Sequence, residues 1–199
     1  MTALAPAIAR PKTAMSRATF DVISIVAGSL IVAGLAQVSI HLGFTPVPIT
    51  GQTLGVLLVG GSLGALRGGA ALGLYLIEGG IGLPFYAGGT HGWSNLTVSK
   101  LGASGGYLIG FIAAAIVVGY LAERGWDRNL GSSIGAMLLG EVLIYGAGLP
   151  WLAASLHIGA NKAYVYGLYP FIIGDAIKLG LAAAVLPAAW RFVKKGRES

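Results

Sequence analysis

The sequence contains no cysteine and few charged residues. The absence of Cys among 199 residues excludes disulfides, thiolate metal sites and a cysteine nucleophile. Only 10% of the residues are charged, whereas a soluble domain averages about 25%, and no charged residue lies between Asp21 and Arg67. The GxxxxGK(S/T) phosphate loop and the GxSxG and HExxH motifs are also missing. These absences argue against a soluble protein and against ATP hydrolysis by this chain.

What is present is typical of a polytopic membrane protein with one compact domain. Hydrophobic residues make up 55% of the chain, and 33 residues are Gly. The formal charge of +6 does not indicate a nucleic-acid binder, because the Lys and Arg residues lie between apolar runs and do not gather on one soluble face. We therefore expect a lipid bilayer as the surroundings and no nucleic acid among the partners.

Six apolar segments predict an all-α membrane protein with six transmembrane helices. A helix needs about 20 apolar residues to cross the hydrocarbon layer, or fewer where it ends in a protein-lined cavity. Pro46 and Pro48 break the chain after the first segment. We expect a cytoplasmic segment at 1–20, a transmembrane domain at 21–193 and a basic tail at 194–199. The predicted helices cover residues 22–42, 52–66, 69–83, 105–122, 131–152 and 168–192.

The distribution of Lys and Arg predicts that both termini are cytoplasmic. Short cytoplasmic connections carry an excess of these residues. With six helices and an inner N-terminus, only Lys100 and Lys162 fall outside, and Lys178 lies within a helix. The first apolar run is too long for the core of a signal peptide, so we interpret it as a transmembrane helix. The ten residues placed inside are Arg10, Lys12, Arg17, Arg67, Arg124, Arg128, Arg191, Lys194, Lys195 and Arg197.

Small residues recur at helical spacing and predict close contacts between helices. Gly60, Gly64 and Gly68 are four residues apart, which is the spacing that lets helix backbones approach in a membrane. Such faces can pack inside one bundle or against another subunit. On the first helix, Ser29 and Ala33 are candidates for an outward docking face.

Four ionisable residues fall within the predicted helices: Glu78, Glu141, Asp175 and Lys178. A charge at mid-membrane costs about 2.5 to 3.5 kcal/mol on insertion scales, so each needs a partner or a function. Asp175 and Lys178 are three residues apart and share a helix face. They could form an internal salt bridge, or they could bind a ligand, with the carboxylate accepting N–H groups and the ammonium holding an anion. Glu141 suits a protonated or hydrogen-bonded packing residue.

The predicted outer side is rich in aromatic rings, which can anchor helices at the membrane interface or line a pocket. Their position near Asp175 and Lys178 favours an outward-facing ligand pocket. His41, His91 and His157 have no spacing typical of a metal site, so we predict neither a metal nor a cofactor. The aromatic and polar candidates are Phe85, Tyr86, Trp93, Asn95, Tyr107, Trp151, Tyr164, Tyr166 and Tyr169.

Four motifs occur in order along the chain: TPVPITGQT at 45–53, YLxEG at 75–79 with GLPF and AGG following, GxxGGYL at 102–108, and GDxxK at 174–178. Together they resemble the BioY family, the substrate-binding S components of energy-coupling-factor biotin transporters. The resemblance covers about residues 20–195. Ala103-Ser104 stands where the family pattern leads us to expect Pro-Thr.

The resemblance implies an outward-facing biotin pocket and partners that supply energy. Asp175 would accept a ureido N–H and Lys178 would be the cation of the site. The loop around Gln52 would be the lid. A transmembrane T component and ABC-type ATPase subunits would drive uptake across the bacterial inner (cytoplasmic) membrane. Asn95 would join the ligand contacts, and Phe85, Tyr86, Trp93 and Tyr107 would pack on the apolar rings.

Three alternatives are consistent with the same residues. The chain could be an S component for a different vitamin, because the Asp175 and Lys178 pair suits other ligands with N–H donors and a carboxylate. It could be a structural subunit of a membrane complex without a ligand. An intramembrane enzyme using Glu78, Glu141 and Asp175 is a further possibility, but the sequence offers no nucleophile or metal constellation, and we predict that the chain is not an enzyme.

Overall fold

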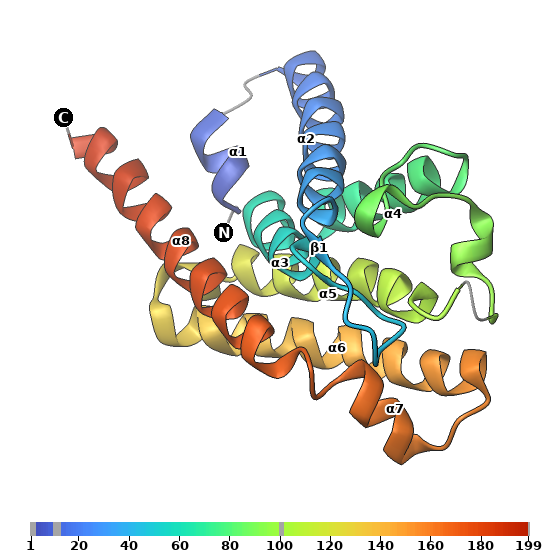
Figure 1. Ribbon diagram of the computed structural model, residues 1–199. Coiled ribbons are helices and arrows are strands. Elements are labelled where there is room, and N and C mark those ends of the chain that lie inside the picture. The colour runs from blue at the N-terminus through green and yellow to red at the C-terminus, as the bar shows by residue number, and fades with distance from the viewer. Residues whose placement is uncertain (1–2, 10–12, 100–101, 199) are drawn as a thin grey trace.

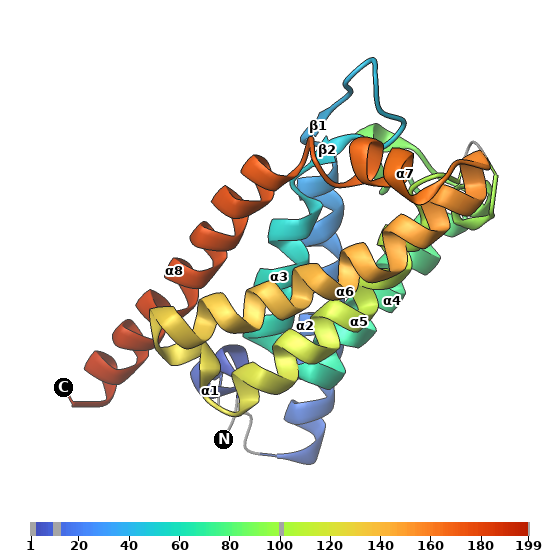
Figure 2. The same cartoon turned by 90° about the horizontal axis from the view of Figure 1, so that it is seen from below.

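The structure is a computed structural model, and it describes residues 3–9, 13–99 and 102–198. It is a helical bundle in which α5 and α6 run side by side (Figures 1 and 2). Its elements are α1 (Leu4–Ala9), α2 (Ala14–Ala36), β1 (Ser39–Ile40), β2 (Ile49–Thr50), α3 (Gln52–Leu63), α4 (Ala65–Gly80), the 3₁₀ turns η1 (Ala87–Gly89) and η2 (Trp93–Leu96), α5 (Gly105–Glu123), the 3₁₀ turn η3 (Trp126–Arg128), α6 (Leu130–Leu156), α7 (Ala160–Gly167) and α8 (Ile172–Glu198).

Among the residues that the structure describes, four helices are long and apolar enough to cross a membrane: Ser16–Ala36 of α2, α5, α6 and Ile172–Val193 of α8. The chain is therefore an all-helical, multi-pass membrane protein apart from the two short strands. The remaining two predicted segments became α3 and α4, with 12 and 16 residues. At 1.5 Å per residue these helices are about 18 and 24 Å long, less than the roughly 30 Å of a hydrocarbon core.

The first helix lies earlier in the chain than we predicted. The helix α2 begins at Ala14 and ends at Ala36, whereas the apolar run predicted 22–42. It ends early because the following residues turn into β1, which pairs antiparallel with β2 across the loop that contains the two prolines. The side-chain amide of Gln37 donates to the carbonyl oxygens of Ala33 and Pro84. This amide ties the end of α2 to the loop that follows α4.

Gly64 separates α3 from α4, so the predicted boundary at 66–69 was wrong by a few residues. Its φ of 89° and ψ of 179° lie in a region that only glycine adopts without strain. The backbone N–H of Ala65 then donates to the carboxylate of Glu123 over 3.1 Å. The sharp reversal therefore depends on a glycine and on a cap supplied by the end of α5.

The predicted close packing inside the bundle is confirmed for Gly60 and Gly68. A Cβ atom at Gly60 would lie 2.9 Å from Ala115 Cα, and one at Gly68 would lie 3.0 Å from Gly60 Cα. These helices therefore meet backbone to backbone around α5. A Cβ at Gly73 or Gly131 would meet nothing within 4 Å, so small residues at those positions are not needed for packing within the chain.

The prediction that Ser29 and Ala33 form an outward docking face was wrong. Both residues are buried within the chain, with 0% and 5% of their surface exposed. The hydroxyl of Ser29 donates to the carbonyl of Val26. The outward face of α2 carries larger apolar side chains, including Val22 and Leu30. The small residues therefore serve the contact between α2 and the rest of the bundle.

Two helices were not predicted. The short helix α1 falls in the expected N-terminal segment, contacts α3 and α8, and buries Leu4 and Ala7. The helix α7 lies between α6 and α8 and buries Ala163. Figure 2 shows β1, β2 and α7 gathered at one end of the bundle, and α1 and η3 at the opposite end. One end of the bundle is therefore covered by loops, the two strands and α7, and the other end is covered by α1 and a short turn.

Candidate ligand-binding site

A cavity lies at the end of the bundle that carries β1, β2 and α7. Its lining comes from the loop between the two strands, the loops that follow α4, and helices α3, α5, α6 and α8. Most of the wall is apolar and includes Leu108, Phe111, Ile144 and Phe171. An apolar pocket with a few convergent polar groups is the usual form of a small-molecule site.

Asp175 and Lys178 form the ionic centre of this cavity. The ammonium of Lys178 is 2.8 Å from Oδ1 of Asp175, as their spacing on one helix predicted. Asp175 is 6% exposed, and both residues line the cavity. The pair is therefore both a salt bridge and a part of the pocket surface, so the two alternatives drawn from the sequence do not exclude each other.

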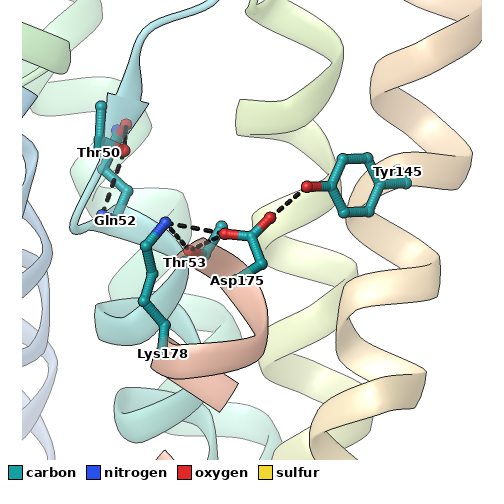
Figure 3. Close-up of polar contacts among 6 residues, drawn as sticks. All are labelled: Thr50, Gln52, Thr53, Tyr145, Asp175 and Lys178. Atoms are coloured by element: carbon teal, nitrogen blue, oxygen red, sulfur yellow. Dashed lines mark hydrogen bonds and ion pairs between the residues drawn. The ribbon is translucent and has the colours of Figure 1, made fainter. Parts of the chain in front are cut away.

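Two further residues hold the same carboxylate, and the sequence analysis missed them. The hydroxyl of Thr53 donates to Oδ1 of Asp175 over 3.3 Å and accepts from Lys178 over 3.1 Å. The hydroxyl of Tyr145 donates to Oδ2. Figure 3 shows Lys178 and Tyr145 pointing toward Asp175 from opposite sides. Thr53 belongs to the TPVPITGQT motif and so carried a signal that could have identified it, whereas no motif or spacing singled out Tyr145 on α6.

Gln52 also lines the cavity, next to this cluster, and its amide has protein partners. Its carbonyl oxygen accepts from Thr50 over 2.8 Å, and its amide nitrogen donates to the Tyr75 hydroxyl over 2.5 Å. Tyr75 in turn donates to the carbonyl of Phe85 over 3.1 Å. Gln52 thus connects the start of α3 to the loop after α4. A role in ligand binding stays a prediction.

The loop at 41–48 covers one side of the cavity. Pro46, Val47 and Pro48 all line it. Thr45 donates to the carbonyl of Tyr166 at the end of α7 over 2.6 Å. The loop is therefore attached to α7, and its role as a lid stays a prediction.

Three more of the predicted residues, Tyr86, Asn95 and Tyr107, line the cavity. Tyr86 donates to the carbonyl of Leu76, and burial raises its pKa to about 12, so the phenol stays neutral. Tyr107 donates to the carbonyl of Gly167 over 2.8 Å. Six of the eight predicted site residues therefore surround one cavity, and their contact with a ligand stays a prediction.

Phe85 and Trp93 do not line the cavity. Phe85 packs against the apolar core. Trp93 is 52% exposed and covers Gly80, where a Cβ atom would touch its ring. They were chosen because they lie in aromatic-rich outer loops, and that position does not determine which way a ring points.

The two glutamates within the helices are placed differently from Asp175. Glu141 is buried, and neither of its carboxyl oxygens has a hydrogen-bond partner among the described residues. Oε2 of Glu78 is likewise buried without a described partner. Neither residue lines the cavity. Within the described parts of the chain, no group of three or more His, Cys, Asp or Glu residues is arranged to hold a metal ion.

Comparison with known proteins gives a consistent result. A model of the BioY family matches residues 9–195. A biotin transporter BioY of Rhizobium etli is 38% identical over 151 residues, covering 72% of this chain and 78% of the relative. A probable biotin transporter BioY of Pyrococcus horikoshii is 36% identical over 150 residues, covering 75% and 83%.

A solved structure is also similar over nearly its whole length. It is a crystal structure of the S-component for biotin from an ECF-type ABC transporter. The TM-score is 0.75 with 26% sequence identity, and the alignment covers 90% of this chain and 94% of the solved one. The likeness therefore extends from the motifs to the arrangement of the helices.

Proposed function

The chain belongs to the BioY family, and from that membership we propose that it is the biotin-binding S component of an energy-coupling-factor transporter. It is a transport subunit and not an enzyme. The observation that carries the proposal is the ion pair of buried Asp175 and partly buried Lys178 in an apolar cavity. Biotin has two ureido N–H groups and a carbonyl, an apolar thioether ring and a valerate carboxylate. The cavity offers acceptor oxygens for the N–H groups, an apolar wall for the ring and chain, and an ammonium for an oxygen of the ligand.

Asp175 is the proposed acceptor for one ureido N–H, and Lys178 is the proposed cation. Lys178 uses its ammonium for Asp175 and Thr53, and an ammonium has three N–H donors. One donor therefore remains for an oxygen of the ligand. Hydrogen bonds that involve a charged group contribute about 1.5 to 3 kcal/mol each, so this pair would account for a large part of the affinity.

Asn95 is the proposed second acceptor. Its amide nitrogen donates to the carbonyls of His91 over 2.7 Å and Gly92 over 3.3 Å. Because both amide hydrogens have partners in its own loop, the side-chain oxygen is the atom left for a ligand. The two N–H groups of a cyclic urea point away from each other, and acceptors on α8 and on the loop before α5 suit that geometry.

The apolar wall is the proposed contact for the thioether ring and the methylene chain. Phe111 of α5, Ile144 of α6 and Phe171, in the turn just before α8, line the cavity together. Each buried methylene contributes about 0.8 kcal/mol. Together with the polar contacts, an enclosed site of this kind can reach nanomolar affinity, about −12 kcal/mol, which suits a nutrient that is scarce outside the cell.

We further propose six membrane crossings, with both termini in the cytoplasm and the cavity opening outward. The start of α2, the turn between α3 and α4 and the turn between α5 and α6 lie toward the end of the bundle that carries α1, opposite α7 (Figure 2). By the bounds of these elements, Arg17, Arg67, Arg124 and Arg128 fall in or next to these segments. An excess of basic residues marks the cytoplasmic side. Arg67 is paired with Asp21 over 2.6 Å, so part of this charge also ties α4 to α2. The crossing by α3 and α4 would use their short helices plus the loops at the cavity end.

Energy for uptake must come from other subunits, because the sequence contains no phosphate-binding loop. As an S component, the chain would work with a transmembrane T component and ABC-type ATPase subunits in the bacterial inner (cytoplasmic) membrane. The motifs and the cavity give no reason to assign an ATPase function to the chain itself.

The test is to purify the chain in detergent, identify small molecules released on denaturation by mass spectrometry, and titrate the ligand-free protein with biotin. Release of biotin and saturable binding are expected. Release of a different vitamin would mean that the ligand is not biotin, and the chain would still be an S component of a transporter. No released ligand together with no biotin binding would overturn the proposal in favour of a structural subunit.

A further inference from the structure

We propose that Tyr145 is a positioning residue that sets the ligand selectivity of the site by occupying one lone pair of Asp175. The inference rests on the proposed function, because it concerns how the same carboxylate meets a ureido group. It adds a residue that the family motifs did not single out.

The hydrogen bonds around Asp175 leave room for only one more donor. An ionised carboxylate has about four lone-pair positions. Oδ1 accepts from Lys178 over 2.8 Å and from Thr53 over 3.3 Å, and Oδ2 accepts from Tyr145. Three positions are therefore used within the protein. The fourth, on Oδ2, is the one that remains for a ligand in the cavity.

Tyr145 is itself held in place. Its ring lies edge-on to that of Tyr107, with centroids 6.0 Å apart and an interplanar angle of 87°. Tyr107 is fixed in turn by its hydrogen bond to the carbonyl of Gly167. Tyr145 comes from α6 and Asp175 from α8, so the bond also sets the orientation of the carboxylate relative to the opposite wall of the cavity.

This arrangement suits a neutral urea or amide and disfavours a cationic ligand. A guanidinium or amidinium group binds a carboxylate best through two N–H donors at once, and that mode needs two free acceptor positions. Here only one is left, because Tyr145 occupies the other position on Oδ2. A neutral ring that presents one N–H forms its full hydrogen bond, because it needs only one acceptor position on the carboxylate. The selectivity thus follows from how many lone pairs the protein itself consumes.

The test compares two ligands in one variant. The hydroxyl is removed by Tyr145→Phe, and binding of biotin and of 2-iminobiotin is measured by calorimetry near pH 7. In 2-iminobiotin the ureido carbonyl is replaced by C=NH, which makes the group a protonated guanidine. We expect biotin affinity to fall by about fivefold to tenfold, as for loss of one hydrogen bond. We expect 2-iminobiotin to lose less, because the freed lone pair on Oδ2 accepts its extra N–H, so the preference for biotin shrinks at least about threefold.

A purely structural role for Tyr145 would weaken both ligands by the same factor, and that result, or unchanged binding of both, overturns the inference. Thr53→Val frees a lone pair on Oδ1 without changing side-chain volume much, and it should reduce the preference in the same direction. If the Tyr145→Phe protein does not fold, the Thr53→Val protein provides the test instead. Tyr120→Phe removes a hydroxyl from a half-exposed position on α5 and should leave the preference unchanged. If the wild-type protein binds neither ligand, the proposed function fails first.

Discussion

Thr45 and Tyr166 are 121 positions apart in the sequence, yet the Thr45 hydroxyl donates a hydrogen bond of 2.6 Å to the Tyr166 carbonyl. The next carbonyl, of Gly167, accepts from Tyr107 in the cavity wall. Two consecutive carbonyls at the end of α7 therefore accept hydrogen bonds, one from the loop at 41–48 and the other from Tyr107 in the cavity wall. The short helix links the loop that would close over a ligand to the residues that would touch it.

The first prediction concerns this link. Thr45→Val removes the hydroxyl and keeps the shape, so the loop should open more often. We expect bound biotin to dissociate about three to ten times faster, consistent with one hydrogen bond of about 1 kcal/mol. The measurement is the dissociation rate of labelled biotin after dilution. Thr45→Ser retains the donor and should keep the wild-type rate, and an unchanged rate in the valine variant would mean that the bond does not hold the loop.

Lys178 supplies the second prediction. Lys178→Ala leaves Asp175 without its cation in a buried site and removes a donor to the ligand. We expect biotin binding to weaken by at least about 1.5 kcal/mol, which is more than tenfold. Equilibrium binding in detergent measures the effect. Lys162→Ala on the exposed side of α7 removes the same charge away from the cavity and serves as the control. Equal affinity in both variants would make the pair only a structural bridge.

The third prediction tests the close approach of α3 and α5. In Gly60→Ala the new methyl group would lie 2.9 Å from Ala115 Cα, and backbone cannot move aside cheaply. We expect a loss of about 1 to 3 kcal/mol, the usual cost of overpacking. Gly73→Ala on α4 meets no atom within 4 Å and should be neutral or gain up to about 1 kcal/mol from helix propensity. Thermal unfolding of both variants in the same detergent makes the comparison. Similar midpoints would refute the packing argument.

The fourth prediction concerns the end of the bundle opposite the cavity. Trp190 of α8 donates its indole N–H to Oδ2 of Asp127 in η3, and Asp127 is 2% exposed. Burial raises the pKa of Asp127, and the bond from Trp190 opposes part of that shift. Trp190→Phe leaves the carboxylate buried without this donor and should cost about 1 to 3 kcal/mol of stability.

The effect should depend on pH in a defined direction. A carboxyl whose pKa is higher in the folded than in the unfolded state favours folding when protonated, so its stabilising contribution falls as the pH rises. Removing the Trp190 donor raises the folded pKa of Asp127 further. The loss caused by Trp190→Phe should therefore be smallest where the carboxyl is protonated, and it should grow as the pH rises through the raised folded pKa, which lies above the value of about 4 in the unfolded chain. Unfolding midpoints of the variant and of Trp126→Phe, whose ring is 39% exposed, measured across this range provide the check. A loss independent of pH would point to packing alone.

Much of the fold was predictable because it depends on local composition. The apolar runs and breakers identified α5 nearly to the residue, and the spacing of Asp175 and Lys178 predicted their ion pair. The reversal at Gly64 was not predictable, since its cap comes from Glu123 at the end of another helix. Nor was α7, which is short and only partly apolar and is held by contacts with Thr45 and Tyr107.

The site likewise has residues that the sequence predicted and residues that depend on contacts between distant helices. Gln52, Asn95 and Asp175 lay in motifs or in a unique position within a loop, and the structure brings them to one cavity. Tyr145 was missed because its importance arises from the crossing of α6 and α8, which sequence spacing does not define. Trp93 was included because its loop is aromatic, although its ring covers a glycine of α4.

The most direct test of the account is a calorimetric titration of the purified chain with biotin, run in parallel with Asp175→Asn. The asparagine keeps the size of the side chain but loses the charge that pairs with Lys178 and replaces one acceptor oxygen by a donor. We predict one tight site in the wild-type protein and an affinity at least about tenfold weaker in the variant. Equal affinity in the two proteins, or no binding of biotin by the wild-type chain, would contradict the account.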